Sequence, residues 1–282
     1  MSNKTKHDDD EGLAPQDSDQ VEGPGIDHWP LLSDEVVLAI LRYLPQKVLV
    51  TLSMVNKRMR DLSRDDSLWT ELTLDYEDIT QREGSYRDLV ERCKKLASLK
   101  ITHKENFFSS VNSNIMPVVI GAKNCLKSLE VDWSWNYWTD AAMCQLSEMK
   151  GLRNLSFTMN SVQNPKSVSN LAQLDQIEIL KINYTRKILL PNYTRNLEEE
   201  LEVRRNFTEF DPIMKYVLQQ LKKLKIVDLY LPGYAGSDEM LVALASNNPG
   251  LKVLSNLGGF KSVKSIEVLA TKCRDLHALQ ID

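Results

Sequence analysis

The sequence has no long hydrophobic run and no strong excess of charge of one sign. No apolar stretch approaches the roughly 18 residues that a transmembrane helix needs. Lys and Arg together number 35 and Asp and Glu 39, for a formal net charge of -4. Proteins that bind nucleic acid phosphates usually carry a strong basic excess. We therefore expect no membrane span and no nucleic acid partner.

Side chains typical of active sites are also few. There are four cysteines and four histidines, and no two cysteines have the C-x-x-C spacing of zinc sites. The G-x-S-x-G, Walker-loop and H-E-x-x-H motifs are missing. We therefore expect no catalytic residues, no metal and no cofactor, and we predict that the chain is not an enzyme.

A secretory signal is missing from the N-terminus, because the first residues do not combine a basic start with an apolar core. The protein is therefore predicted to be cytoplasmic and/or nuclear, where cysteines stay thiols. Residues 1–28 carry eight acidic residues against two lysines, a net of -6 that leaves +2 for the rest of the chain. With few large apolar residues, this tail cannot offset the entropy of ordering, and we predict that it is disordered.

Residues 29–69 contain three short runs with helical hydrophobic spacing. Ser33 is a predicted N-cap followed by two acidic residues, and Pro45 ends the first run. About forty residues bury too little core for a confidently stable lone domain, and three short helices would leave apolar side chains exposed. This surplus predicts that a partner covers one face of the module.

Three motifs carry a family resemblance: Leu32-Ser33-Asp34-Glu35, Val55-Asn56-Lys57-Arg58-Met59 and Ser67-Leu68-Trp69. The segment resembles an F-box, in which the usual proline, cysteine and tryptophan are here Ser33, Asn56 and Met59. An F-box implies docking to the small adaptor subunit of an SCF ubiquitin ligase. The residues that the resemblance assigns to adaptor binding are Leu32, Ser33, Val36, Ile40, Leu41, Leu44, Leu49, Leu52 and Met59. The alternative is an ordinary helical cap on the repeats that follow.

From residue 69 onward the chain repeats the pattern Leu-x-x-Leu-x-apolar. Copies begin at Trp69, Leu96, Leu126, Leu152, Ile177, Leu224, Leu251 and Leu276. Most lie 25 to 30 residues apart, but one gap is 47, and a degenerate copy at Glu198-Leu201-Val203 would divide it. The last copy ends the chain without a capping helix, so we expect either a longer form or a partner on that strand edge.

Periods of this length and pattern resemble leucine-rich repeats. Alternation places the leucines of each short strand inward, and cap residues such as Thr139 and Ser237 predict a helix after the strand. Cys93 and Cys273 stand three residues before the first leucine of their units, which resembles the cysteine-containing subclass, and Asn248 holds that place in another. We expect these thiols to fill the turn between helix and strand.

The predicted fold is therefore α/β: a leucine-rich-repeat solenoid, or horseshoe, with parallel strands on its concave face and helices on its convex face, preceded by a small all-α F-box. The predicted domains are a disordered acidic tail at 1–28, the F-box at 29–68 and the repeats at 69–282.

The outward residues of the strands mix charges, hydroxyls and amides, which suits a protein ligand better than a phosphate polymer. Trp133, Trp135, Tyr137 and Trp138 also fall within six residues, and such aromatics are enriched at binding hot spots or cover a sheet edge. The predicted substrate-binding residues are Lys100, Glu130, Asp132, Trp133, Trp135, Lys181, Asp228 and Tyr230.

An F-box followed by leucine-rich repeats resembles the substrate receptors of cullin-RING (SCF) ubiquitin ligases. The resemblance implies two partners, the SCF adaptor subunit, and through it the cullin-RING ligase, and a protein substrate held by the repeats. The alternative is a leucine-rich-repeat interaction scaffold that is not part of a ubiquitin ligase.

Overall fold

The computed structural model describes most of the chain after the N-terminal tail. The described residues are 31–81, 83–102, 109–110, 115–132, 136–159, 161–162, 164–184, 210, 212–230, 237–256 and 262–280. The predicted disordered tail, Trp133 and Trp135 lie outside these residues. None of the helices described is both long and apolar enough to cross a bilayer.

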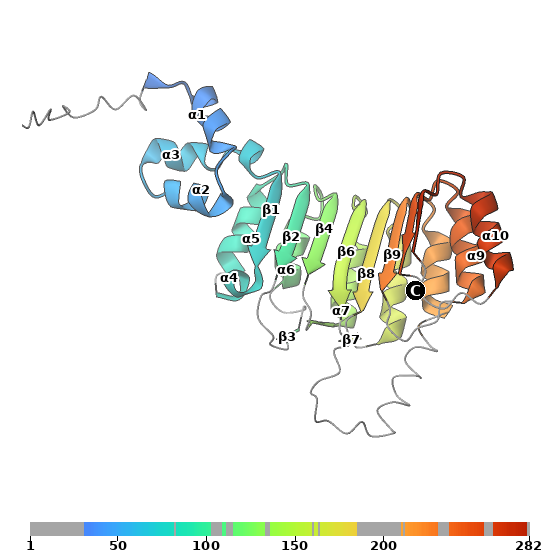
Figure 1. Cartoon of the computed structure of the whole chain (residues 1–282). Helices are drawn as coiled ribbons and strands as arrows, with labels where there is room; N and C mark the ends of the chain where they lie inside the picture. The colour runs from blue at the N-terminus through green and yellow to red at the C-terminus, as the bar shows by residue number, and fades with distance from the viewer. Residues whose placement is uncertain are drawn as a thin grey trace, which may run out of the picture.

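The repeats form one eight-stranded sheet in which every neighbouring pair is parallel (Figure 1). Strand order follows chain order, so each unit adds one strand beside the last. The strands are β1 (Glu71–Asp75), β2 (Ser98–Thr102), β4 (Ser128–Asp132), β6 (Asn154–Met159), β8 (Ile179–Tyr184), β9 (Ile226–Tyr230), β10 (Val253–Ser255) and β11 (Ala278–Leu279).

The register aligns equivalent positions of successive copies. Leu72 lies opposite Leu99, Leu99 opposite Leu129, and Leu129 opposite Leu155. These leucines are almost completely buried, whereas the residues between them are more exposed. The alternation therefore forms an apolar stack behind the sheet and a polar face in front, which confirms the predicted leucine-rich-repeat solenoid.

Helices cover the other side of the sheet (Figure 1). They are α4 (Tyr76–Gln81), α5 (Glu83–Arg92), α6 (Ile115–Gly121), α7 (Asp140–Ser147), the 3-10 helix η3 (Pro165–Gln173), a helix over 212–220, α9 (Asp238–Asn247) and α10 (Val263–Lys272). The predicted caps are confirmed, because the hydroxyls of Thr139 and Ser237 accept from the backbone N–H of Ala142 and Met240, both at 3.2 Å. A small second parallel sheet, which the sequence did not predict, joins β3 (Ser109–Ser110), β5 (Asn136–Trp138) and β7 (Ser161–Val162).

The long gap between copies adds no strand to the sheet. β8 pairs directly with β9, with Ile179 opposite Ile226 and Lys181 opposite Asp228. Residues 198–203, where the sequence allows a degenerate copy, lie outside the described residues. The direct pairing leaves no room for a strand between β8 and β9.

Cysteine and asparagine fill the turns between helices and strands, as predicted. The Cys273 Sγ lies 3.4 Å from the Asn248 carbonyl oxygen, and the Cys125 Sγ lies 3.7 Å from that of Cys93. All four cysteines are free thiols. Burial raises the pKa of the Cys125 and Cys273 thiols, which keeps them protonated and poorly reactive at neutral pH.

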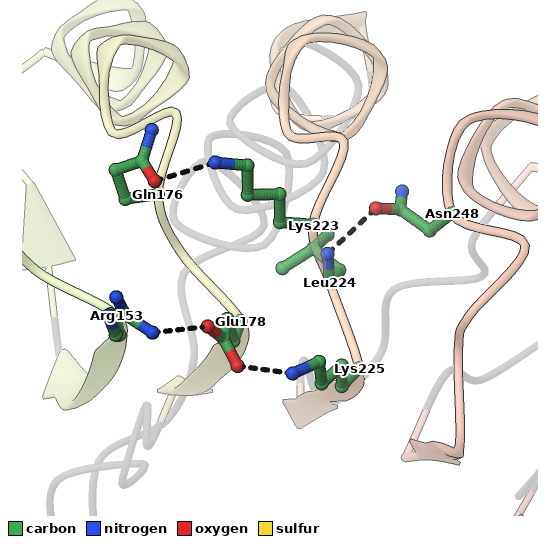
Figure 2. Close-up of polar contacts among 7 residues, drawn as sticks. All are labelled: Arg153, Gln176, Glu178, Lys223, Leu224, Lys225 and Asn248. Carbon is green, nitrogen blue, oxygen red and sulfur yellow. Dashed lines mark hydrogen bonds and ion pairs between the residues drawn. The ribbon is translucent and has the colours of Figure 1, made fainter.

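An ion-pair ladder crosses three strands at the start of β8. The Glu178 carboxylate accepts from Arg153 at 3.1 Å on one side and from Lys225 at 2.6 Å on the other (Figure 2). Lys225 belongs to the unit that follows the long gap, so Glu178 joins the two halves of the solenoid. The hydrogen bond from Lys225, with a smaller contribution from Arg153, lowers the pKa of Glu178 below its ordinary value.

This ladder makes a pH-dependent contribution to stability. Since the folded-state pKa of Glu178 is lowered, its contribution is present above the unfolded-state pKa of about 4.3 and is lost as pH falls through the folded-state value. Glu178→Gln should therefore lower the thermal unfolding midpoint at pH 7, and the difference from wild type should shrink as the solution is acidified below about pH 4. Glu267→Gln is the control, because Glu267 is exposed on α10 and forms no ion pair with any other described residue. An equal difference at both pH values would contradict this role.

Candidate functional site: an apolar helical surface and a polar hollow

The N-terminal module is made of three short α-helices and a 3-10 turn. They are α1 (Asp34–Leu41), α2 (Gln46–Leu52), α3 (Lys57–Leu62) and η2 (Asp66–Leu68). Figure 1 shows the module beyond β1, at the end of the solenoid where the sheet begins. The three helical runs expected from the sequence are therefore present.

Polar contacts fix these helices to one another. The Arg58 guanidinium on α3 bonds to the Asp34 carboxylate at 2.8 Å and to the Leu32 carbonyl. The Asn56 side chain caps α3 by accepting from the Met59 N–H at 2.8 Å, so this departure from the F-box pattern has a structural use. Ser33 stands at the N-cap of α1, as predicted, although its side chain forms no capping hydrogen bond there.

The module leaves many large apolar side chains exposed, as its composition predicted. Tyr43 is 90% exposed and Met54 72%. The full set, which we call the apolar surface, is Leu31, Val36, Ile40, Tyr43, Val48, Val50, Met54 and Val55. So dense a group within 25 residues of chain is unusual for a surface that faces only water.

The structure divides the predicted adaptor-binding residues into three groups. Val36, Ile40 and Ser33 are exposed, whereas Leu32, Leu44 and Leu52 are half-buried against the core. Leu41, Leu49 and Met59 are buried, at 1%, 2% and 8% exposure. These three are core residues that hold the helices together, and contact between any of the predicted set and an adaptor stays a prediction. The sequence reasoning missed Leu31, Tyr43 and Met54, large apolar residues that lie just before or after the first two helices.

The module is joined directly to the first strand of the sheet. The Gln46 side chain donates to the Glu71 carbonyl and accepts from the Thr73 N–H at 3.1 Å, so it pairs with β1 much as another strand would. Trp69 is buried and donates from Nε1 to the Ser63 carbonyl at 2.8 Å. The module thus covers the edge of β1, which is the role of a cap, while its apolar surface still faces outward.

A polar hollow of about 450 Å³ lies on the strand face of the solenoid. It is formed by residues of four neighbouring strands, β4, β6, β8 and β9, and by the residue that follows β10. The lining residues are Glu130, Val131, Asp132, Ser156, Thr158, Lys181, Ile182, Asn183, Asp228, Tyr230 and Asn256. Most of the backbone of the hollow is fixed by the strand pairing, so its side chains stand on a rigid base.

Hydrogen bonds orient two of its acidic groups. The Lys100 ammonium, from the next strand, lies 2.7 Å from the Glu130 carboxylate, and this hydrogen bond raises the pKa of Lys100. The Asn256 side chain donates to the Asp228 carboxylate at 2.7 Å. The Thr158 hydroxyl lies 3.5 Å from an oxygen of Asp132, which is a weak contact.

The structure brings together most of the predicted substrate-binding residues. Glu130, Asp132, Lys181, Asp228 and Tyr230 all line the hollow. Lys100 adjoins it through its ion pair with Glu130 and does not line it. Whether any of them contacts a substrate stays a prediction.

Asn256 is one of the hollow residues that the sequence did not predict as a binding residue. Asn256 occupies the third site of the weakest repeat copy, where the pattern calls for an apolar residue, and its φ of 57° lies in the left-handed region. Asparagine tolerates that conformation better than most residues. The polar residue in an apolar position was the available signal.

Of the tryptophans in the aromatic cluster, Trp138 lies in the core, whereas Trp133 and Trp135 are outside the described residues. Trp138 is completely buried, packs against Phe157 with ring centroids 5.0 Å apart, and donates from Nε1 to the Thr158 carbonyl at 3.2 Å. It is a core residue that packs β5 of the small sheet against β6 of the large one. Because Trp133 and Trp135 lie outside the described residues, their contact with a ligand stays a prediction. In the described part of the chain, no group of three or more His, Cys, Asp or Glu side chains could hold a metal ion.

The N-terminal module matches a known protein family. Residues 31–75 match the family model described as F-box-like. No curated protein matches the sequence. The chain therefore combines an F-box-like segment with a leucine-rich-repeat solenoid.

Solved structures similar to the chain include three bacterial proteins. A leucine-rich-repeat protein of Leptospira interrogans is 15% identical with a TM-score of 0.38, over 81% of this chain and 52% of its own. An internalin of Listeria monocytogenes is 13% identical with a TM-score of 0.29, over 69% and 56%. A Bacteroides fragilis protein is 14% identical with a TM-score of 0.37, over 76% and 65%. The chain thus spans less than two thirds of each, and the fold rests on the strand register and burial described above.

Proposed function

We propose that this protein is the substrate-recognition adaptor of an SCF-type ubiquitin ligase. Its F-box-like module docks the ligase adaptor subunit, and its repeats hold a target protein for ubiquitination. The mechanism is proximity, because holding the target beside the ubiquitin-charged enzyme raises the effective concentration of its lysines. No bond chemistry is assigned to this chain.

The observation that carries the proposal is the apolar surface of the F-box-like module. A module that served only as a cap would bury its apolar side chains against the solenoid. Here Gln46 and Trp69 already provide the cap contacts, yet Val36, Ile40 and their neighbours remain exposed. Burying the exposed part of these side chains in an interface gains about 25 cal/mol per Å² of apolar surface removed from water, which favours a partner over solvent.

The spacing of the module supports the same proposal. The ungapped segment from Trp29 to Trp69 resembles the F-box of the mammalian S-phase-kinase-associated F-box protein, and we extend the proposal to that type of F-box. The departures at Ser33 and Asn56 leave the helices intact, and Met59 fills a core position. A scaffold outside any ligase is the competing function.

Capture of the recombinant SCF adaptor subunit by the full-length chain tests the proposal. We expect Val36→Asp combined with Ile40→Asp to weaken capture by more than about hundredfold, since two charges would be buried in the interface. The matched control is Val263→Asp with Ile266→Asp, which places the same charges at exposed apolar positions of α10. No capture by folded wild-type protein, or equal loss in both double variants, would exclude the ligase role and favour the scaffold.

A further inference from the structure

The charges of the hollow are unequally paired, and this imbalance indicates what it binds. Apart from the phenol of Tyr230, its ionisable lining residues are three acids and one base. They are Glu130, Asp132, Asp228 and Lys181. Glu130 is already neutralised by Lys100 at 2.7 Å. The remaining groups are two carboxylates against one ammonium, so the hollow keeps an excess of negative charge.

The Asp228 carboxylate is held in place for an incoming group. One of its oxygens accepts from the Asn256 side chain, and Asn256 is itself fixed by its left-handed backbone and by its N–H, which donates to the Gln280 carbonyl at 3.1 Å. Lys181 lies opposite Asp228 in the register, but no ion pair forms between the two residues. Asp228 is thus oriented by a neutral amide and keeps its charge available.

An exposed aromatic ring lies next to this carboxylate. Tyr230 is two residues beyond Asp228 on the same face of β9, a separation of about 7 Å, and is 43% exposed. A guanidinium can bond to a carboxylate while it stacks on an aromatic face. Ser156, Thr158 and Asn183 add neutral polar groups to the lining, which suit a peptide backbone.

We infer that the hollow recognises a segment of the target protein through an unphosphorylated basic side chain, with arginine placed against Asp228 and Tyr230 and with Asp132 adding to the attraction. This rests on the proposed function and names the chemistry of its substrate. A phosphate group is disfavoured, because phosphate recognition uses clusters of cations and Lys181 is a single ammonium beside Asp228.

Three synthetic peptide mixtures test this inference on the immobilised full-length chain. Each mixture is 11 residues long and degenerate except for a central arginine, glutamate or phosphoserine. At low salt we expect about tenfold greater retention of the arginine mixture than of the other two. Preferential retention of the phosphoserine or glutamate mixture, or no preference, would overturn the inference.

Charge variants assign any preference to the hollow. Asp132→Asn with Asp228→Asn keeps side-chain shape and should abolish the arginine preference, whereas Lys181→Gln should strengthen it. The matched control, Glu267→Gln with Asp275→Asn, removes two exposed acids outside the hollow and should leave retention unchanged. An equal loss of arginine-mixture retention in both double variants would show general charge attraction and would contradict a site in the hollow.

Adaptor capture, measured on the same proteins, separates the two proposals. Loss of the arginine preference with intact adaptor capture removes only the inference about the hollow. Failure of adaptor capture with an intact arginine preference removes the ligase role and keeps the hollow as the peptide site of a scaffold.

Discussion

Replacing Trp138 by alanine is expected to destabilise the solenoid by about 3–5 kcal/mol, the cost of removing a large aromatic side chain from a well-packed core. Trp138 is completely buried between the small sheet and the large one, and its ring packs on Phe157. The free energy of unfolding in urea measures the effect. Because this loss is a large part of the stability of an ordinary domain, the variant should also unfold at markedly lower temperature.

Two further variants separate packing from hydrogen bonding. Trp138→Phe keeps most of the apolar volume and loses the bond from Nε1 to the Thr158 carbonyl, so we expect a smaller loss of about 1–2 kcal/mol. Tyr230→Ala removes an exposed aromatic side chain and should change stability by about 0.5 kcal/mol or less. Trp138→Ala with near wild-type stability would show that the ring is not a core element.

The leucine pattern predicted the large sheet because inward side chains determine where each strand lies. Leu99, Leu129 and Leu155 are aligned by the register and share one apolar stack. The helices could be placed where a cap residue precedes them, as at Thr139 and Ser237. Both signals are local, and short connections between units force the same arrangement on each copy.

The small sheet and the long gap could not be predicted in the same way. Strands of two residues, such as Ser109–Ser110 and Ser161–Val162, have no hydrophobic period of their own and pair only because the large strands bring them together. In the long gap, Leu201 and Val203 match part of the repeat pattern. The direct pairing of β8 with β9 nevertheless leaves no strand between β8 and β9.

Helical spacing alone could not divide the module into core and surface. Val36 and Leu41 both belong to the apolar runs of α1, yet Val36 is exposed and Leu41 is buried. A short helix with apolar side chains on more than one side can turn any of them toward its neighbours. The choice follows from the contacts of the other helices and of β1, which the sequence of α1 does not contain.

The second large effect is expected at Asn248, whose side chain is buried and ties one unit of the solenoid to the preceding one. Its Oδ1 accepts from the Leu224 N–H at 2.8 Å (Figure 2), and its Nδ2 donates to the Leu244 carbonyl at 3.1 Å. Asn248→Ala would leave the Leu224 N–H buried without an acceptor, at a cost of about 1–3 kcal/mol, and would add a small cavity. We therefore expect a total loss of about 2–4 kcal/mol in the free energy of unfolding.

The neighbouring residue provides the control, because Asn247 is only half-buried and its side chain bonds only within its own helix, to the Ala243 carbonyl. Asn247→Ala should cost about 0.5 kcal/mol or less. Asn248→Cys should fall between the two alanine variants, since a thiol fills the space, as Cys273 does one unit later, but accepts hydrogen bonds weakly. Hydrogen exchange at the Leu224 amide gives a site-specific measure, and it should speed up in Asn248→Ala but not in Asn247→Ala. Because Leu224 begins the first repeat copy after the long gap, unchanged exchange there would show that this unit is held by strand pairing alone.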